Sequence, residues 1–344
     1  HCLTNRILLR GKMELGEKPT KLHELVAECA SGHPGQICII FDSGKGEATE
    51  QQSITYAQLW QKVTELKLEF ENLSIKEQIV GVLLTDGLSI PSVLMSLLST
   101  SCAFHPMNIE GVQYTAAALR NAGVPWILVH SELVQKLDPL LKLLNGCQVS
   151  SEVLSKNGLE LFQIKHSSNP GLASVKQNDL AYCITTSGTT STPKMVYVSH
   201  ACIVPNIINL RNIFQLGLND RVLLTSPLTF DPSIVEIFCT LSSGACLVIV
   251  PSDIKRRPEK LLEIIHDRQT ITVLQTTPTL LRSVPPSKLQ QSLLGPTTSL
   301  RVLALGGEMF PTKDVLRGWL HPENSKTQFY NLYGITEVSC WASC

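Results

Sequence analysis

Short apolar runs of β type alternate with helical patterns along most of the chain, and this alternation constrains the fold more than any other feature. The apolar runs are Ile37–Phe41, Ile79–Leu84, Trp126–Val129, Val222–Thr225, Cys246–Val250, Thr272–Leu274, Val302–Leu305 and Phe329–Leu332. The helical patterns between them are Tyr56–Leu73, Ile90–Leu98, Gln113–Asn121, Ile203–Phe214, Pro232–Leu241, Pro258–His266 and Lys313–Leu320. Such alternation favours parallel strands joined by right-handed crossovers. The sequence therefore predicts an α/β fold with mostly parallel sheets flanked by helices.

The length of the chain allows more than one subdomain. It has 344 residues, of which 43% are hydrophobic and only 17% are charged, so it can bury a large core. The most polar and least periodic stretch, 146–178, predicts a variable linker. We therefore expect an extension of uncertain structure over 1–19, a front subdomain over 20–145 and a rear subdomain over 179–344.

Charge and cysteine usage exclude several classes of protein. Lys plus Arg and Asp plus Glu balance at 29 each, which argues against a nucleic-acid partner. The 11 cysteines are scattered without a CxxC pair, so buried, reduced thiols fit better than a zinc site. No run is long enough for a membrane span, and no signal-peptide core precedes the first methionine. These features predict a cytoplasmic location.

A loop rich in hydroxyl groups lies at 185–194, which reads Thr-Thr-Ser-Gly-Thr-Thr-Ser-Thr-Pro-Lys. Its N–H groups and hydroxyls can donate to a polyanion, with Lys194 as a cation. The apolar run 180–184 and the alternating run 195–199 predict that it joins two strands, whereas a Walker loop opens into a helix. Taken alone, the segment is equally consistent with a polar hairpin that binds no ligand.

The segment 331–337, Asn-Leu-Tyr-Gly-Ile-Thr-Glu, combines a strand end and a glycine turn with a hydroxyl and a carboxylate after the turn. Tyr333 offers a flat face to a purine, Thr336 a donor to phosphate and Glu337 an oxygen ligand to Mg²⁺. The structural alternative is a turn into a helix, with Thr336 as N-cap and Glu337 favoured by the helix dipole.

Two further segments carry the same ambiguity. Gly306 and Gly307 end a strand and permit close approach of a planar ligand, but they also fit an ordinary left-handed turn. Asp231 precedes Pro232 and an apolar helix, so it can be an N-cap with proline at the first helical position. Alternatively, Asp231 faces a pocket and pairs with a substrate ammonium.

Together, these segments resemble the adenylate-forming (AMP-binding) superfamily, in the same order and at similar spacing. This superfamily includes acyl-CoA synthetases, luciferases and the adenylation domains of nonribosomal peptide synthetases. Ile54–Leu59 also resembles its early LTYxEL segment, and Ser99–Asn108 its KAGAAYVPLDP segment. The resemblance covers 20–344 and is greatest to the members that activate beta-alanine.

The resemblance implies an acid–thiol ligase that uses ATP and Mg²⁺. Such enzymes convert a carboxylate, here a small amino acid such as beta-alanine, into an acyl-adenylate and pyrophosphate. The acyl group then passes to the thiol of a phosphopantetheine carrier or of CoA.

Residue roles follow from the same resemblance. The residues implied to bind the β- and γ-phosphates are Thr186, Ser187, Gly188, Thr189, Thr190, Ser191 and Lys194. Those implied to hold adenine are Gly306, Gly307, Asn331 and Tyr333. Phe230 and Asp231 would contact the acyl substrate. Thr336 and Glu337 would be catalytic, Thr336 on the α-phosphate and Glu337 as the Mg²⁺ ligand.

The chain departs from the family pattern at three places. Ser191 and Ser101 stand where most members have glycine. The chain also stops seven residues after Glu337, before the family's ribose-binding aspartate, hinge and C-terminal lid domain with its catalytic lysine. We therefore expect a fragment with weak or no turnover alone.

Two other functions stay open at this point. Asp231 favours an amino acid as substrate, because a buried carboxylate without an amine to pair with is costly. An acyl-CoA synthetase for a carboxylate without an amine is the first alternative. A non-catalytic fragment that serves only in binding is the second.

Overall fold

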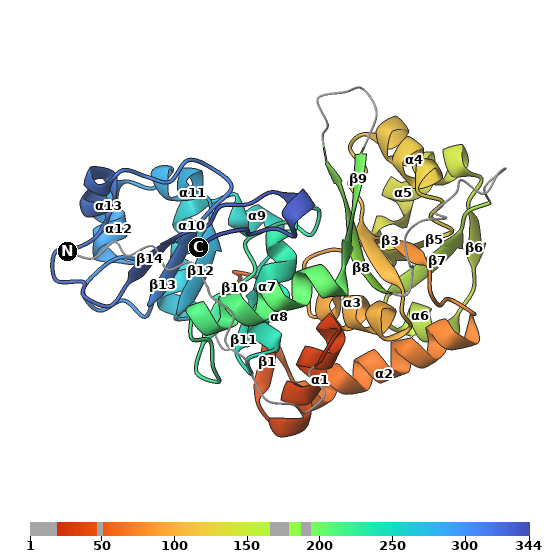
Figure 1. Ribbon diagram of the computed structural model, residues 1–344, viewed down its shortest axis with the longest axis horizontal. Helices are drawn as coiled ribbons and strands as arrows, with labels where there is room; N and C mark the ends of the chain where they lie inside the picture. The colour runs from red at the N-terminus through yellow and green to blue at the C-terminus, as the bar shows by residue number, and fades with distance from the viewer. Residues whose placement is uncertain (1–18, 47–50, 166–178, 187–193) are drawn as a thin grey trace.

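The computed structural model describes residues 19–46, 51–165, 179–186 and 194–344. These residues form two seven-stranded sheets that lie in separate lobes, with helices between and below them (Figure 1). Sheet 1 has the strand order β14-β13-β12-β10-β11-β1-β2, and sheet 2 has the order β6-β7-β5-β3-β4-β8-β9. The expected α/β fold is confirmed.

Sheet 1 is parallel except at its β2 edge. Its strands are β1 (Ile37–Phe41), β2 (Gln52–Thr55), β10 (Arg221–Leu223), β11 (Cys246–Ile249), β12 (Val273–Thr276), β13 (Val302–Leu305) and β14 (Gln328–Asn331). Sheet 2 is mixed, with β3, β4, β5 and β8 parallel and β6, β7 and β9 antiparallel to their neighbours. Its strands are β3 (Ile79–Leu83), β4 (Ala103–Pro106), β5 (Trp126–His130), β6 (Cys147–Val149), β7 (Leu159–Gln163), β8 (Leu180–Thr186) and β9 (Lys194–Ser199).

Two of the helices are buried on every side. In α3 (Ser89–Ser99) and α8 (Pro232–Leu241), residues 90–98 and 233–241 are all buried, as expected for a helix enclosed by other elements. The other α-helices are α1 (Leu22–Gly32), α2 (Tyr56–Asn72), α4 (Val112–Asn121), α5 (Val134–Leu144), α6 (Glu152–Lys156), α7 (His200–Ile213), α9 (Ser252–Lys255), α10 (Pro258–Glu263), α11 (Pro278–Arg282), α12 (Pro286–Gln291) and α13 (Lys313–Trp319). Among the described residues, no helix combines the length and apolar character that a bilayer crossing requires.

The two sheets divide the chain differently from the expected subdomains. β1 and β2 come from the expected front part but join sheet 1, while β8 and β9 come from the expected rear part but join sheet 2. The expected linker 146–178 is also regular in its described portion, where it contains β6, α6 and β7. Strand partners are chosen by contacts distant in sequence, which local composition does not reveal.

Ser101, between α3 and β4, occupies a left-handed conformation with φ 58°. Its hydroxyl accepts a hydrogen bond from Lys21 Nζ at 3.3 Å. Since glycine adopts this conformation without strain, we expect Ser101→Gly to stabilise the fold by about 0.5–1 kcal/mol in urea denaturation. Ser99→Gly is the control, and it should cost about 1 kcal/mol because Ser99 lies within α3. Destabilisation by Ser101→Gly would show that the Lys21 contact outweighs the strain.

Candidate functional site

The candidate site lies where strands of both sheets end at their carboxyl sides. Residues that follow β10, β12 and β13 of sheet 1 line one cavity, and residues at the ends of β4 and β8 of sheet 2 line another. Ligands of α/β proteins commonly bind at this edge.

Three adjoining cavities make up the site. The Trp341 cavity has a volume of about 390 Å³ and is lined by Ser226, Gln275, Gly306, Gly307 and Trp341, among others. The threonine cavity, of about 400 Å³, is lined by His105, Tyr114, Thr185, Thr186 and Thr336, among others. Phe230 lines both. A third cavity, of about 490 Å³, shares Pro227 with the first and Thr229 with the second. The segment 225–232 therefore runs through the centre of the site.

The hydroxyl-rich loop joins two antiparallel strands, as the sequence predicts. Thr186 ends β8 and pairs in register with Lys194, the first residue of β9. Thr186 also lines the threonine cavity. The remaining expected phosphate ligands lie outside the described residues, namely Ser187, Gly188, Thr189, Thr190 and Ser191.

Asp231 stands directly before Pro232 at the start of α8, but its side chain makes no capping hydrogen bond. Asp231 is only 7% exposed, and its Oδ2 atom has no hydrogen-bond partner among the described residues. Burial raises the pKa of Asp231 to about 6. A hydrogen bond from the Thr336 side chain lowers this pKa, and the negative charge of Glu337 raises it further. A buried carboxylate left in this state is an acceptor for a cationic ligand.

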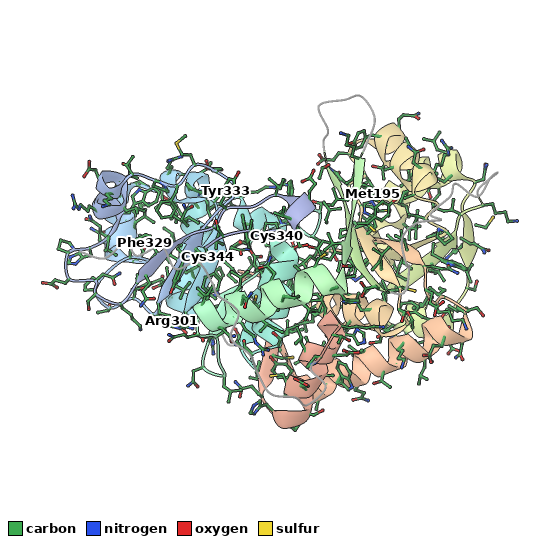
Figure 2. The ribbon with its side chains drawn as sticks, viewed as in Figure 1. Met195, Arg301, Phe329, Tyr333, Cys340 and Cys344 are labelled. Atoms are coloured by element: carbon green, nitrogen blue, oxygen red, sulfur yellow. The ribbon has the colours of Figure 1, made fainter. Side chains whose placement is uncertain are left out.

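The segment that carries Tyr333 is held by the chain that returns beside it. Tyr333 donates its N–H to the Ser343 carbonyl at 3.1 Å and accepts at its own carbonyl from the N–H of Ala342 at 2.8 Å. Its ring is 70% exposed. Gly334 lies against the backbone of Cys340, close enough that a Cβ atom would be 1.8 Å from the Cys340 oxygen. Figure 2 shows Tyr333 and Cys340 on this part of the chain.

Thr336 and Glu337 begin a single 3₁₀ turn, Thr336–Val338, instead of a longer helix. The N-cap position of this turn is occupied by Ile335, and Thr336 is its first residue, so the N-cap interpretation of Thr336 does not apply. The turn packs beside β9, the strand that begins with Lys194 (Figure 1). Thr336, Glu337 and the end of the hydroxyl-rich loop are thus brought to one place.

The double glycine follows β13 and lies against Trp341. Gly307 has φ +76°, and a Cβ atom on Gly306 would be 2.5 Å from the Trp341 ring. Because Leu305 pairs in register with Asn331, the ends of β13 and β14 are neighbours, and Gly306 lies near the Tyr333 segment. The four residues expected to hold adenine therefore come from two adjacent strand ends.

Comparison with protein families identifies the chain. The family model described as "AMP-binding enzyme" matches residues 26–344. The chain belongs to the AMP-binding enzyme family. The resemblance found in the sequence is confirmed.

Several curated proteins are similar to this AMP-binding chain. The beta-alanine-activating enzyme of Danio rerio is 37% identical over 337 residues, which cover 94% of this chain and 29% of the relative. The human enzyme of the same name is 36% identical, with 94% and 32% covered. Nonribosomal peptide synthetase ivoA of Emericella nidulans is 29% identical, with 92% and 17% covered. The chain thus spans a third or less of the length of these relatives.

Solved structures of related proteins have the same fold. The nonribosomal peptide synthetase FmoA3 superposes with a TM-score of 0.70 at 20% identity, over 93% of this chain and 32% of FmoA3. The N-terminal subdomain of Klebsiella oxytoca NpsA, in complex with 3-hydroxybenzoyl-AMSN, gives a TM-score of 0.68 at 20% identity, with 93% and 74% covered.

The sequence analysis does not single out three residues that are hydrogen-bonded to one another at or beside this candidate site, namely Trp341, Gln275 and Glu236. Trp341 donates its Nε1–H to Gln275 Oε1 at 2.9 Å, and Gln275 donates its Nε2–H to Glu236 Oε1 at 3.0 Å. Glu236 is 2% exposed and also accepts from Thr225 and Ser226. The sequence carries one signal for this cluster: Glu236 is a charged residue inside an otherwise apolar helix, and a buried charged residue has to be hydrogen-bonded.

Proposed function

We propose that this chain forms the nucleotide- and acyl-binding core of an enzyme that activates a small amino acid, such as beta-alanine, with ATP. The product is an acyl-adenylate destined for a thiol. The observation that carries the proposal is the buried Asp231 carboxyl, whose Oδ2 lacks a partner among the described residues. A substrate ammonium would supply both the charge and the hydrogen bond. The names of the beta-alanine-activating relatives support this choice of substrate.

In the proposed reaction, a carboxylate oxygen of the substrate attacks the α-phosphorus of ATP, and the bond from that phosphorus to pyrophosphate breaks. Asp231 would hold the substrate amine and so orient the carboxylate. Thr336, which shares the threonine cavity with Thr186, would donate to the phosphate group under attack. Lys194, in register with Thr186, would neutralise charge on the leaving pyrophosphate. The chain's contribution is positioning and charge neutralisation.

Mg²⁺ fits this arrangement through Glu337. No group of three or more potential metal ligands occurs among the described residues. Mg²⁺ commonly takes one or two protein carboxylates and completes its shell with phosphate oxygens and waters, so a single glutamate beside Thr336 suits it. When bound with ATP, the ion would neutralise phosphate charge.

The thiol acceptor belongs to the proposal as well. A carrier-bound phosphopantetheine or CoA would take the acyl group from the adenylate. The similarity to nonribosomal peptide synthetases supports a carrier.

We also propose a cytoplasmic location. The described cysteines are free thiols, seven of them out of ten buried or partly buried, which suits a reducing compartment.

Calorimetric titration with two non-hydrolysable adenylate analogues tests the proposal. One carries a beta-alanyl group and the other an octanoyl group. We expect the beta-alanyl compound to bind more tightly, since only it can pair with Asp231. Tighter binding of the octanoyl compound would instead indicate a carboxylate without an amine. Binding of neither compound by folded chain would indicate a non-catalytic fragment.

A further inference from the structure

The root of the hydroxyl-rich loop is paired with a strand on one side only. β9 pairs with β8 as far as Thr186, opposite Lys194. On the other side, β4 pairs with β8 in parallel, with Phe104 opposite Tyr182. Continued in that register, β4 reaches only residue 184 before it ends at Pro106. Thr185 and Thr186 extend beyond it.

A histidine from β4 contacts β8 just before this unpaired edge and at its first residue. His105 Nδ1 lies 3.0 Å from the carbonyl oxygen of Cys183. Because a carbonyl can only accept, Nδ1 carries the hydrogen, and Nε2 is left as an acceptor 3.4 Å from the hydroxyl oxygen of Thr185. His105 is 2% exposed, and burial lowers its pKa, so the ring stays neutral at physiological pH.

A tyrosine from α4 contacts the backbone of the unpaired edge itself. The Tyr114 hydroxyl donates to the carbonyl of Thr186 at 2.9 Å. Its ring is 37% exposed, so the side chain lies at the rim of the fold and contributes little to the core. Tyr114 and His105 both line the threonine cavity, which Thr336 also lines.

We propose that Tyr114 and His105 are positioning residues for the triphosphate of ATP. Tyr114 takes the place of a missing strand partner at Thr186, His105 contacts Cys183 and Thr185, and together they fix the end of β8. Through the Thr186–Lys194 pair they also fix the start of β9 relative to Thr336. Neither residue takes part in the chemical step. The inference rests on the proposed function, since it requires that phosphates lie between these elements.

Tyr114→Phe removes only the hydroxyl group. Measuring the affinity of this variant for two ligands shows whether Tyr114 positions the hydroxyl-rich loop or only supports the fold. The probes are a β,γ-non-hydrolysable ATP analogue and the beta-alanyl adenylate analogue, which lacks the β- and γ-phosphates. Loss of one hydrogen bond, about 1 kcal/mol, should raise the Kd of the ATP analogue roughly 3- to 10-fold. The Kd of the adenylate analogue should not change, because this ligand has no β- and γ-phosphates for the loop to contact.

Tyr330→Phe is the matched control. Its hydroxyl donates to Gln328 Oε1 at 2.8 Å on β14, and Tyr330 does not line the threonine cavity. The Kd of both ligands should be unchanged. His105→Leu should weaken binding of the ATP analogue but not of the adenylate analogue. His105→Asn should restore part of the affinity for the ATP analogue, because the asparagine amide N–H can reach the Cys183 carbonyl.

Three results would overturn the inference. Equal weakening of both ligands by Tyr114→Phe would show that the hydroxyl supports the fold as a whole. An unchanged Kd for the ATP analogue in both Tyr114→Phe and His105→Leu would show that neither contact matters. Failure of the unaltered, folded chain to bind either ligand would overturn the proposed function, and this inference with it.

Discussion

Replacing Asp231 with asparagine is expected to weaken binding of a beta-alanyl adenylate analogue by about 100-fold, because a buried, hydrogen-bonded charge pair is worth roughly 2–5 kcal/mol to the complex. Asparagine keeps the shape of the side chain but cannot neutralise an ammonium. Binding of the octanoyl analogue should change by less than about threefold. Calorimetric titration of both proteins with both compounds measures the effect. A comparable loss for the two analogues would place Asp231 in general support of the site instead.

The pH dependence gives an independent check on Asp231. Its pKa of about 6 means that the carboxyl group becomes protonated as the pH falls through 6, so affinity for the beta-alanyl analogue should fall there in the unaltered protein only. Because the folded-state pKa exceeds the unfolded value, the folded chain holds this proton more tightly, and the group costs stability as the pH rises from about 4 to 6. Asp231→Asn should therefore stabilise the ligand-free chain at pH 7 by on the order of 1–2 kcal/mol.

Gly334→Ala is expected to cost roughly 3 kcal/mol of folding stability, at the upper end of the range for overpacking. The new Cβ atom would be 1.8 Å from the Cys340 oxygen and 2.7 Å from Trp341 Cα. Both are backbone atoms, so no rotamer change can relieve the contact. The returning segment must move, which would break the hydrogen bond from Trp341 to Gln275. Urea denaturation and tryptophan fluorescence measure the two effects.

Gly318→Ala is the control for this substitution. Gly318 lies in α13, and nothing is within 4 Å of its virtual Cβ atom. Alanine there should stabilise the chain by up to about 1 kcal/mol through helix propensity. If Gly334→Ala were as stable as the unaltered chain, the close approach of the two backbone segments described above would be incorrect.

The sequence predicts individual elements well where a run of apolar residues is bounded by turn residues. Ile37–Phe41, Val302–Leu305 and Pro232–Leu241 have the predicted bounds, since each is an apolar run between turn residues. The assignment of strands to sheets was not predictable in the same way. That β8 pairs with β4, a strand about eighty residues earlier, depends on contacts across the whole domain.

The site shows the same distinction between local and distant determinants. An aspartate before a proline is equally suited to cap a helix and to bind an amine, so the sequence left both interpretations of Asp231 open. In the structure the side chain makes no capping bond, and its buried Oδ2 atom has no hydrogen-bond partner among the described residues, which favours the amine-binding interpretation. Trp341 and Gln275 could not be paired from sequence, since their hydrogen bond joins residues 66 positions apart.

The exchange of strands between the two lobes has a consequence for synthesis on the ribosome. β1 emerges early, but its parallel neighbour β11 lies about two hundred residues later in the chain. Until β11 has emerged, the hairpin of β1 and β2 has an unpaired edge, a state that exposes apolar surface and favours aggregation. Sheet 2 can be completed once β9 has emerged, well before sheet 1. Sheet 1 therefore has to be completed after sheet 2, although its strands β1 and β2 are synthesised first.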